Sequence, residues 1–179
     1  MKSIFNEGKG QEISDVLAAK DKRVLMQQAI FKKYPENVII DVKMNIPGPI
    51  KNNHYLERLF NKGIDELEDE FEQAQLEIKK VATWDEDSGS EVFYVSARDA
   101  DRIKKIAVKF EDESKLGRLF DADVLIKDQA MALSRKDYGL PSRHCFLCNR
   151  PAKECARSRR HSVTELQGYI SKIYWEEIR

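Results

Sequence analysis

The sequence predicts an α+β fold, in which helices pack on a mostly antiparallel sheet. Segments rich in β-branched and aromatic residues alternate with segments whose apolar residues recur every three or four positions. Two pairs of predicted strands are neighbours in the chain and are joined by short turns, as in hairpins. The 179 residues are enough for one domain with a core.

The first predicted elements are helical, and a strand follows them. Ser14 is placed to cap a short helix, and a second helical stretch runs from residue 21 to about residue 33. Pro35 ends it, because the residue before a proline avoids the helical conformation. Residues 37–46, NVIIDVKMNI, are rich in β-branched side chains and predict a strand.

Three further helices are predicted. Residues 53–74 carry apolar side chains three and four positions apart, although Gly63 lowers the helix propensity in the middle. Residues 99–113 show the same spacing. A last helix begins at Ser162, which forms a capping-box pattern with Glu165.

Two hairpins complete the predicted sheet. Residues 76–84 and 91–97 flank the turn sequence DEDSG. Residues 121–126 and 131–138 flank KDQA in the same way. The chain that follows shows no periodicity before Ser162, and we expect it to be loop-like.

The composition excludes several classes of function. The chain has 31 basic and 31 acidic residues, so no global field directs it to nucleic acid or to a membrane. No apolar run approaches the length of a transmembrane helix, and the N-terminal residues lack the apolar core of a signal peptide. We therefore expect a cytoplasmic protein that binds neither nucleic acid nor membrane.

Two aspartates interrupt LGRLFDADVL, residues 116–125, a sequence that is otherwise typical of a strand. Alternate side chains of a strand share a face, so Asp121 and Asp123 point the same way and repel each other. A Mg²⁺ ion between them would convert this repulsion into binding and would offset charge during phosphoryl transfer. Solvation of both side chains at a strand end fits the spacing at least as well, because D-x-D alone is a weak motif.

Groups suited to phosphate accompany this pair. Gly117 lets the backbone approach a ligand closely, and Arg118 can bind phosphate through two parallel hydrogen bonds. With the aspartates they predict a nucleotidyl-transfer site. A second anion site is predicted in PGPIKNN, where Gly48 and Lys51 precede the N-terminus of helix 53–74. A rigid turn without a ligand is an equal alternative there.

All three cysteines lie in RHCFLCNRPAKECARSRRH, which has the pattern C-x2-C-x6-C-x5-H. Three thiolates and an imidazole are a common tetrahedral zinc set, so Cys145, Cys148, Cys155 and His161 predict a structural zinc site. Free thiols beside a surface histidine are the alternative, and His144 could take the place of His161.

Basic side chains concentrate in the same segment. Because the cysteines and histidines concentrate there too, we expect residues 140–179 to form a zinc-stapled subregion of a single domain that spans 1–179. A local positive patch of this kind fits a polyphosphate ligand, an acidic partner protein or a solvated loop. Its members are Arg143, Arg150, Lys153, Arg157, Arg159 and Arg160.

Four segments, in this order, closely resemble the citrate lyase holo-acyl-carrier-protein synthase family: PGPIK, LGRLFDADVL, LSRKDYGLP and RHCFLCNRPAKECARSRRH. This family is also called apo-citrate lyase phosphoribosyl-dephospho-CoA transferase, and the resemblance extends from about Ser14 to about Ile173. It implies an enzyme with a nucleotidyltransferase-like fold. The reaction would move the phosphoribosyl-dephospho-CoA group of 2'-(5''-triphosphoribosyl)-3'-dephospho-CoA to a serine of the acyl carrier (gamma) subunit of apo-citrate lyase, with release of diphosphate.

The resemblance also implies roles for the predicted site residues. Asp121 and Asp123 would bind Mg²⁺. From the residues themselves we expect Arg118 to be catalytic, by stabilising the transition state of such a transfer. The basic residues 150–160 would dock an acidic carrier subunit. A non-enzymatic, zinc-stapled adaptor that binds an acidic partner protein is the rival interpretation. The expected substrate-binding residues are Gly48, Lys51, Gly117, Arg135 and Arg143.

Overall fold

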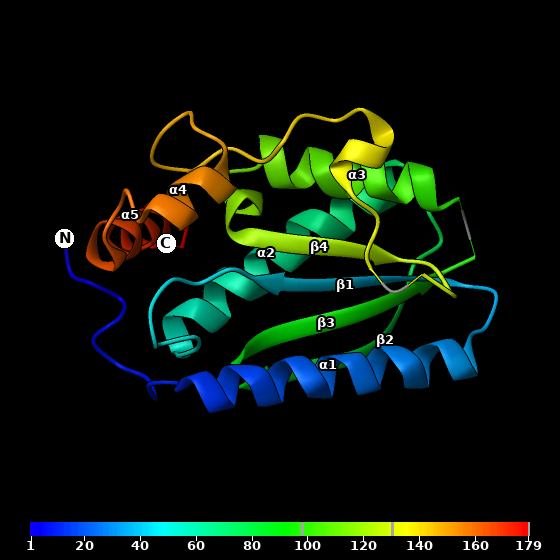
Figure 1. The fold of residues 1–179 in the computed structure, drawn as a ribbon, viewed down its shortest axis with the longest axis horizontal. Coiled ribbons are helices and arrows are strands. Elements are labelled where there is room, and N and C mark those ends of the chain that lie inside the picture. The colour runs from blue at the N-terminus through cyan, green and yellow to red at the C-terminus, as the bar shows by residue number, and fades with distance from the viewer. Residues whose placement is uncertain (98, 130, 179) are drawn as a thin grey trace.

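A computed structural model describes residues 1–97, 99–129 and 131–178. In this part of the chain five α-helices pack on a four-stranded antiparallel sheet, which confirms the predicted α+β class. The strands are ordered β2-β3-β1-β4, so that β1 is central and β4 lies at an edge (Figure 1). They are β1 (Val38–Met44), β2 (Lys79–Glu86), β3 (Gly89–Ser96) and β4 (Phe120–Leu125).

Helices cover both faces of the sheet. α1 (Ile13–Lys33) lies along one face, and α2 (His54–Gln73) and α3 (Ala100–Glu113) cover the other (Figure 1). α4 (Ala152–Ser158) and α5 (Val163–Glu177) lie together at one end of the molecule. No helix in the described part of the chain is both long and apolar enough to cross a membrane.

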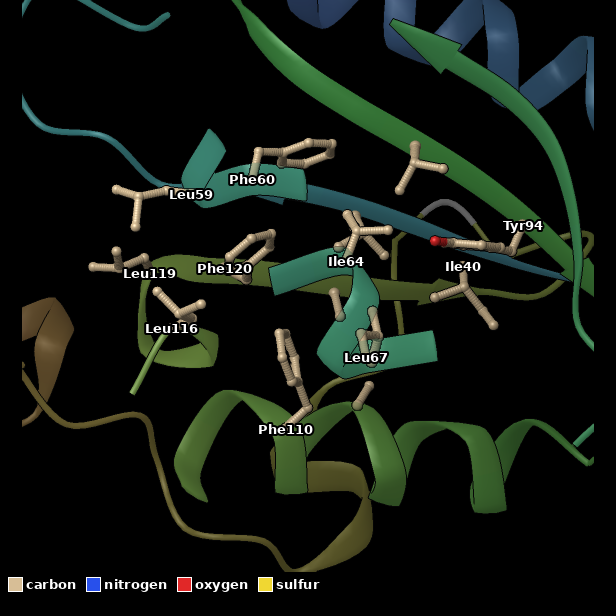
Figure 2. Close-up of a cluster of buried hydrophobic side chains, with 14 of the residues drawn as sticks. Ile40, Leu59, Phe60, Ile64, Leu67, Tyr94, Phe110, Leu116, Leu119 and Phe120 are labelled. Carbon is tan, nitrogen blue, oxygen red and sulfur yellow. The ribbon is translucent and has the colours of Figure 1, made fainter. Parts of the chain in front are cut away.

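The larger core lies between the sheet and helices α2 and α3. Phe120 of β4 packs on Phe60 of α2 and Phe110 of α3, with ring centroids 5.7 and 5.5 Å apart (Figure 2). Gly63 of α2 makes this contact possible, because a Cβ atom there would lie 2.3 Å from the Phe120 ring. A smaller core joins α1 to the opposite face, and it consists of Ile30, Ile39, Phe93, Val95 and Leu125.

The residues before α1 pack against α5. Ile4 is fully buried, and its N–H donates to the Ser171 hydroxyl at 3.2 Å. The indole N–H of Trp175 donates to the carbonyl of Lys2 at 2.8 Å. Segments from opposite ends of the described chain are therefore held together.

Several predicted elements are confirmed with small shifts at their ends. Helices 53–74 and 99–113 correspond to α2 and α3, and the first hairpin corresponds to β2 and β3. The Asn53 side chain accepts hydrogen bonds from the first turn of α2. Ser162 and Glu165 form the predicted capping box of α5.

The predicted break in the first helix is wrong. α1 is continuous from Ile13 to Lys33, because neither glycine nor proline interrupts this stretch. Glu12, rather than Ser14, is the N-cap, and its N–H donates to the Asp15 carboxylate at 2.9 Å.

The predicted second hairpin is also wrong. The Leu133 N–H donates to the Val124 carbonyl at 2.8 Å, but residues 135–138 form the short 3₁₀ helix η2 (Arg135–Tyr138), capped by Ser134 and Asp137. The predicted turn includes residue 130, which lies outside the described residues. Instead of a partner strand, the carboxylate of Glu111 accepts the N–H of Ala122 at the edge of β4, at 2.8 Å.

Two other segments differ from their predicted conformation. Residues 117–119, expected in a strand, form the 3₁₀ turn η1 (Gly117–Leu119). The stretch expected to be a loop before Ser162 contains α4, which ends at Arg159 in the left-handed conformation.

Candidate functional site

The two aspartates of β4 lie on the face of the sheet that α1 covers, as strand alternation predicts. The residues between them and beside them, including Ala122 and Val124, belong to the core on the opposite face. The side chains of Asp121 and Asp123 are 33% and 42% exposed. Both carboxylates are therefore half-buried and accessible to a ligand.

Each of the two aspartates has a cationic partner. The Lys43 ammonium lies 2.8 Å from the Asp123 carboxylate, and the Arg143 guanidinium donates to the Asp121 carboxylate. Burial alone would lower the pKa of Lys43, but the charges of Asp123 and Asp41 raise it. The repulsion between the two aspartates is thus offset by side chains of the protein itself.

A third carboxylate, which is not one of the predicted site residues, faces the pair. Asp41 of β1 lies opposite Asp123 in the strand register and is fully buried. One of its oxygens accepts from the Gln27 amide at 2.7 Å, and the other has no hydrogen-bond partner among the described residues. Burial, and secondarily Glu91, raise the pKa of Asp41 well above its usual range. An aspartate inside the apolar run VIIDVKM was the sequence signal for it.

Arg118 is turned towards the cysteine segment. Its guanidinium donates to the carbonyls of His144 and Cys145, each at 3.2 Å. Gly117 packs closely against α3, because a Cβ atom there would lie 2.0 Å from the carbonyl oxygen of Phe110. Packing therefore accounts for Gly117, and Arg143, rather than Arg118, contacts the acidic pair.

The other predicted phosphate ligands are held elsewhere. Arg135 forms ion pairs with Glu111 at 2.6 Å and Asp112 at 2.9 Å. The Lys51 ammonium donates to the Ile46 carbonyl at 2.6 Å, and burial lowers the pKa of Lys51. Gly48 has φ = +84° and leaves no room for a Cβ atom against α5. Their expected contact with substrate stays a prediction.

The three cysteines and His161 converge. Their ligand atoms all lie within 4.8 Å of one another, and they are the one such group of three or more metal-ligating side chains found among the described residues. Cys148 Sγ lies 3.4 Å from Cys155 Sγ and 3.3 Å from His161 Nε2, and the thiols are free. Sulfurs around a tetrahedral zinc lie about 3.8 Å apart. The four side chains, without His144, therefore form a group that can bind a metal such as zinc.

Local structure brings these four side chains together. A tight turn, closed by the Cys145 N–H to the Arg150 carbonyl at 2.8 Å, presents the first two cysteines. α4 carries Cys155, and the left-handed Arg159 turns the chain so that His161 comes back to the group. A hydrogen bond from His161 lowers the pKa of Cys148 to about 6, which favours the thiolate that metal binding needs.

A cavity of about 540 Å³ lies beside this group. It is bounded by η1, the chain after β1, α4 and the start of α5, and it does not include the aspartates. Arg143 belongs to both places, since it lines the cavity and contacts Asp121. The other arginines of the lining are Arg118 and Arg159, and His144 and His161 line it as well.

The fold and the site define an α+β protein with an acidic strand pair next to a Cys₃His group that can bind a metal. A family model described as apo-citrate lyase phosphoribosyl-dephospho-CoA transferase matches residues 11–177. The chain is 33% identical over 176 residues to the probable apo-citrate lyase phosphoribosyl-dephospho-CoA transferase of Streptococcus pyogenes serotype M18, which covers 96% of this chain and 90% of the relative. It is 34% identical to the enzyme of that name from Escherichia coli O1:K1, over 86% of this chain and 83% of the relative.

A similar match joins the chain to a longer protein. Protein CitXG of Leuconostoc mesenteroides subsp. cremoris is 33% identical over 94% of this chain and 36% of the relative. The chain belongs to the apo-citrate lyase phosphoribosyl-dephospho-CoA transferase family. The resemblance inferred from the sequence is thereby confirmed, and membership in a transferase family does not favour the non-enzymatic adaptor.

Proposed function

We propose that the chain transfers the phosphoribosyl-dephospho-CoA group from triphosphoribosyl-dephospho-CoA to a serine of the acyl carrier subunit of apo-citrate lyase. The match to the transferase family over residues 11–177 carries this proposal. A paired aspartate motif on an antiparallel sheet also supports the nucleotidyltransferase-like character that we expected from the sequence. The serine oxygen forms a bond to the phosphorus next to the ribose, and the bond to the departing diphosphate breaks.

The acidic pair is suited to Mg²⁺. This ion is often held by one or two carboxylates together with the phosphates of the substrate, so a third protein ligand is not required. Asp121 and Asp123 each keep one oxygen that has no hydrogen bond within the described residues. Bound there, Mg²⁺ would offset the negative charge that develops on the phosphate oxygens.

The protein's own side chains prepare the reaction. Arg143 presents its guanidinium at the acidic pair, where its positive charge and an N–H that is not bonded to Asp121 or to the backbone can bind a phosphate oxygen. Lys43 adds a second positive charge on the same face. The proton of the attacking serine passes to a carboxylate of the pair or to water, since both carboxylates are half exposed.

We also propose that the Cys₃His group holds a structural Zn²⁺. Four protein ligands fill a tetrahedral zinc, which leaves no open position for chemistry. The ion would fix α4 and the start of α5 to the turn that carries Cys145. Arg118, which donates to the carbonyl of Cys145, would be positioned by the same ion.

The partner surface proposed for the carrier subunit is the exposed basic segment around α4. Its side chains form no ion pair with another described residue, so their charge is free for an acidic protein. Contacts of this kind mainly raise the association rate and weaken with salt. The residues are Arg150, Lys153, Arg157 and Arg160.

The proposed reaction is tested by intact-mass measurement of the apo carrier subunit after incubation with the donor and Mg²⁺. Wild-type protein should add the mass of the prosthetic group. Asp121→Asn and Asp123→Asn should each slow transfer by roughly 100-fold or more while circular dichroism stays unchanged. Asp128→Asn is the matched control, because Asp128 is exposed and its left-handed backbone, φ = +66°, accepts asparagine. Failure of the wild type to modify the carrier would refute the proposed function.

A further inference from the structure

We propose that the cavity between η1, α4 and α5 binds an organic polyphosphate, with Arg118, Arg143 and Arg159 as its phosphate ligands. This inference rests on the proposed function and deepens it, because it places the charged part of the donor. The cavity volume of about 540 Å³ suits a small ligand or one part of a larger one.

The charge of the cavity wall is positive. None of the described residues that line it is an aspartate or a glutamate. Arg118 contacts neutral carbonyl oxygens, and Arg159 has no acidic partner within the described residues. Guanidinium groups bind phosphate through paired hydrogen bonds and hold their charge at any physiological pH. A ligand with several negative charges is therefore the natural occupant.

The backbone of Arg159 points to a specific use of its side chain. It adopts φ = +47° and ψ = +41° directly after α4, a left-handed position at which glycine and asparagine are favoured. The local fold therefore gives no advantage to an arginine at this position. The backbone of Arg159 makes the turn towards His161, and its side chain contributes to the cavity wall.

The rest of the lining suits an apolar or ring-shaped part of the same ligand. Phe146, Val163 and Leu166 line the cavity, and the ring of Phe146 is stacked on Tyr169 of α5 with centroids 5.1 Å apart. Inorganic phosphate would leave this apolar surface unused. Because Arg143 also contacts Asp121, a phosphate bound to Arg143 lies next to the acidic pair.

Equilibrium binding of adenosine triphosphate and of inorganic triphosphate, at one ionic strength and without carrier subunit, tests the inference. Arg159→Gly should weaken both probes at least tenfold and should not lower the melting temperature, since glycine suits its backbone. Arg157→Ala is the matched control: it removes the same charge from α4 at an exposed position outside the cavity, and it should change binding less than twofold. Phe146→Leu should weaken adenosine triphosphate and leave inorganic triphosphate unchanged.

Two results would overturn the inference. One is unchanged binding in Arg159→Gly with an unchanged zinc content, and the other is an equal loss in Arg157→Ala, which would indicate general attraction to α4. The assay requires no transfer. If the probes bind as expected but the carrier is never modified, the proposed function fails and the cavity assignment stands. If transfer proceeds but Arg159→Gly binds the probes normally, the proposed function stands and the cavity assignment fails.

Discussion

Arg143 and Asp121 connect two parts of the chain that lie 22 residues apart in sequence. The guanidinium of Arg143 donates to the Asp121 carboxylate and to the carbonyl of Phe120. The carbonyl of Arg143 accepts the N–H of Ala152 at the start of α4, at 2.8 Å. The Cys/His segment is thus attached directly to the acidic strand. Arg143 both lines the cavity and contacts Asp121.

Replacing Arg143 should therefore reduce transfer strongly. We expect Arg143→Ala to lower the initial rate roughly 100- to 1,000-fold, because a charged donor next to the reacting phosphate is lost. Arg143→Lys should recover only part of the rate, since an ammonium retains the charge but not the paired hydrogen bonds. The exposed Lys127 serves as control, and Lys127→Ala should keep the wild-type rate. A wild-type rate in Arg143→Ala would exclude this role.

The buried Asp41 should make stability depend on pH. Its folded-state pKa is raised above the unfolded value, so ionisation costs more in the folded protein and stability falls as the pH rises from about 4 towards the folded pKa. The charged groups that face Asp41 are Arg23 from α1, Lys43 from β1, Glu91 from β3 and Asp123 from β4.

Asp41→Asn removes this cost and keeps the shape of the side chain. Its free energy of unfolding should exceed that of the wild type by more at pH 8 than at pH 4, as measured by urea titration. Asp128→Asn, at an exposed position, should show no such dependence. The same difference at both pH values would show that Asp41 is charged in both states or in neither.

The metal assignment separates two histidines. Tag-free wild-type protein should contain about one zinc ion per chain by elemental analysis, and a chelator should lower its melting temperature. His161→Ala should lose the ion, because this side chain belongs to the Cys₃His group. His144→Ala should retain it, since His144 lies outside that group. Zinc-free wild-type protein would refute the assignment.

Two glycines inside helices should respond in opposite ways to the same substitution. Gly63→Ala should destabilise the fold by about 1–3 kcal/mol, because the new Cβ atom meets the Phe120 ring in the core. Gly168→Ala should stabilise it by about 0.5–1 kcal/mol, since no atom of the described residues lies within 4 Å of a Cβ atom there and alanine favours the helix. Thermal unfolding of both variants checks the pair, and a loss of stability in Gly168→Ala would contradict this account.

The predictable parts of the fold were those with strong local signals. Apolar periodicity identified α2 and α3, and the capping pattern at Ser162 located the start of α5. The second hairpin failed because the pairing of a strand depends on the rest of the sheet, and the Ser134 cap started a 3₁₀ turn instead. The start of α1 was placed at Ser14 because serine resembles an N-cap, while Glu12 fills that position.

The candidate site shows the same division. The period of a strand was enough to place Asp121 and Asp123 on one face, and residue spacing was enough to group the cysteines with His161. Nearness in sequence favoured Arg118 as the arginine at the aspartates, but the turn η1 directs it to the cysteine segment. The position of Asp41 opposite Asp123 could not be predicted, because it follows from the register of β1 on β4, which is a tertiary property.

The contact between Ile4 and Ser171 also constrains the order of events during synthesis. These residues are separated by 167 positions, and ribosomes add about 5–20 residues per second, so Ile4 is synthesised about 8 to 33 seconds before Ser171. His161 emerges in the same late interval. The contacts of residues 2–4 with α5 can therefore form only after α5 has been synthesised. The Cys₃His group is likewise incomplete until His161 has been added.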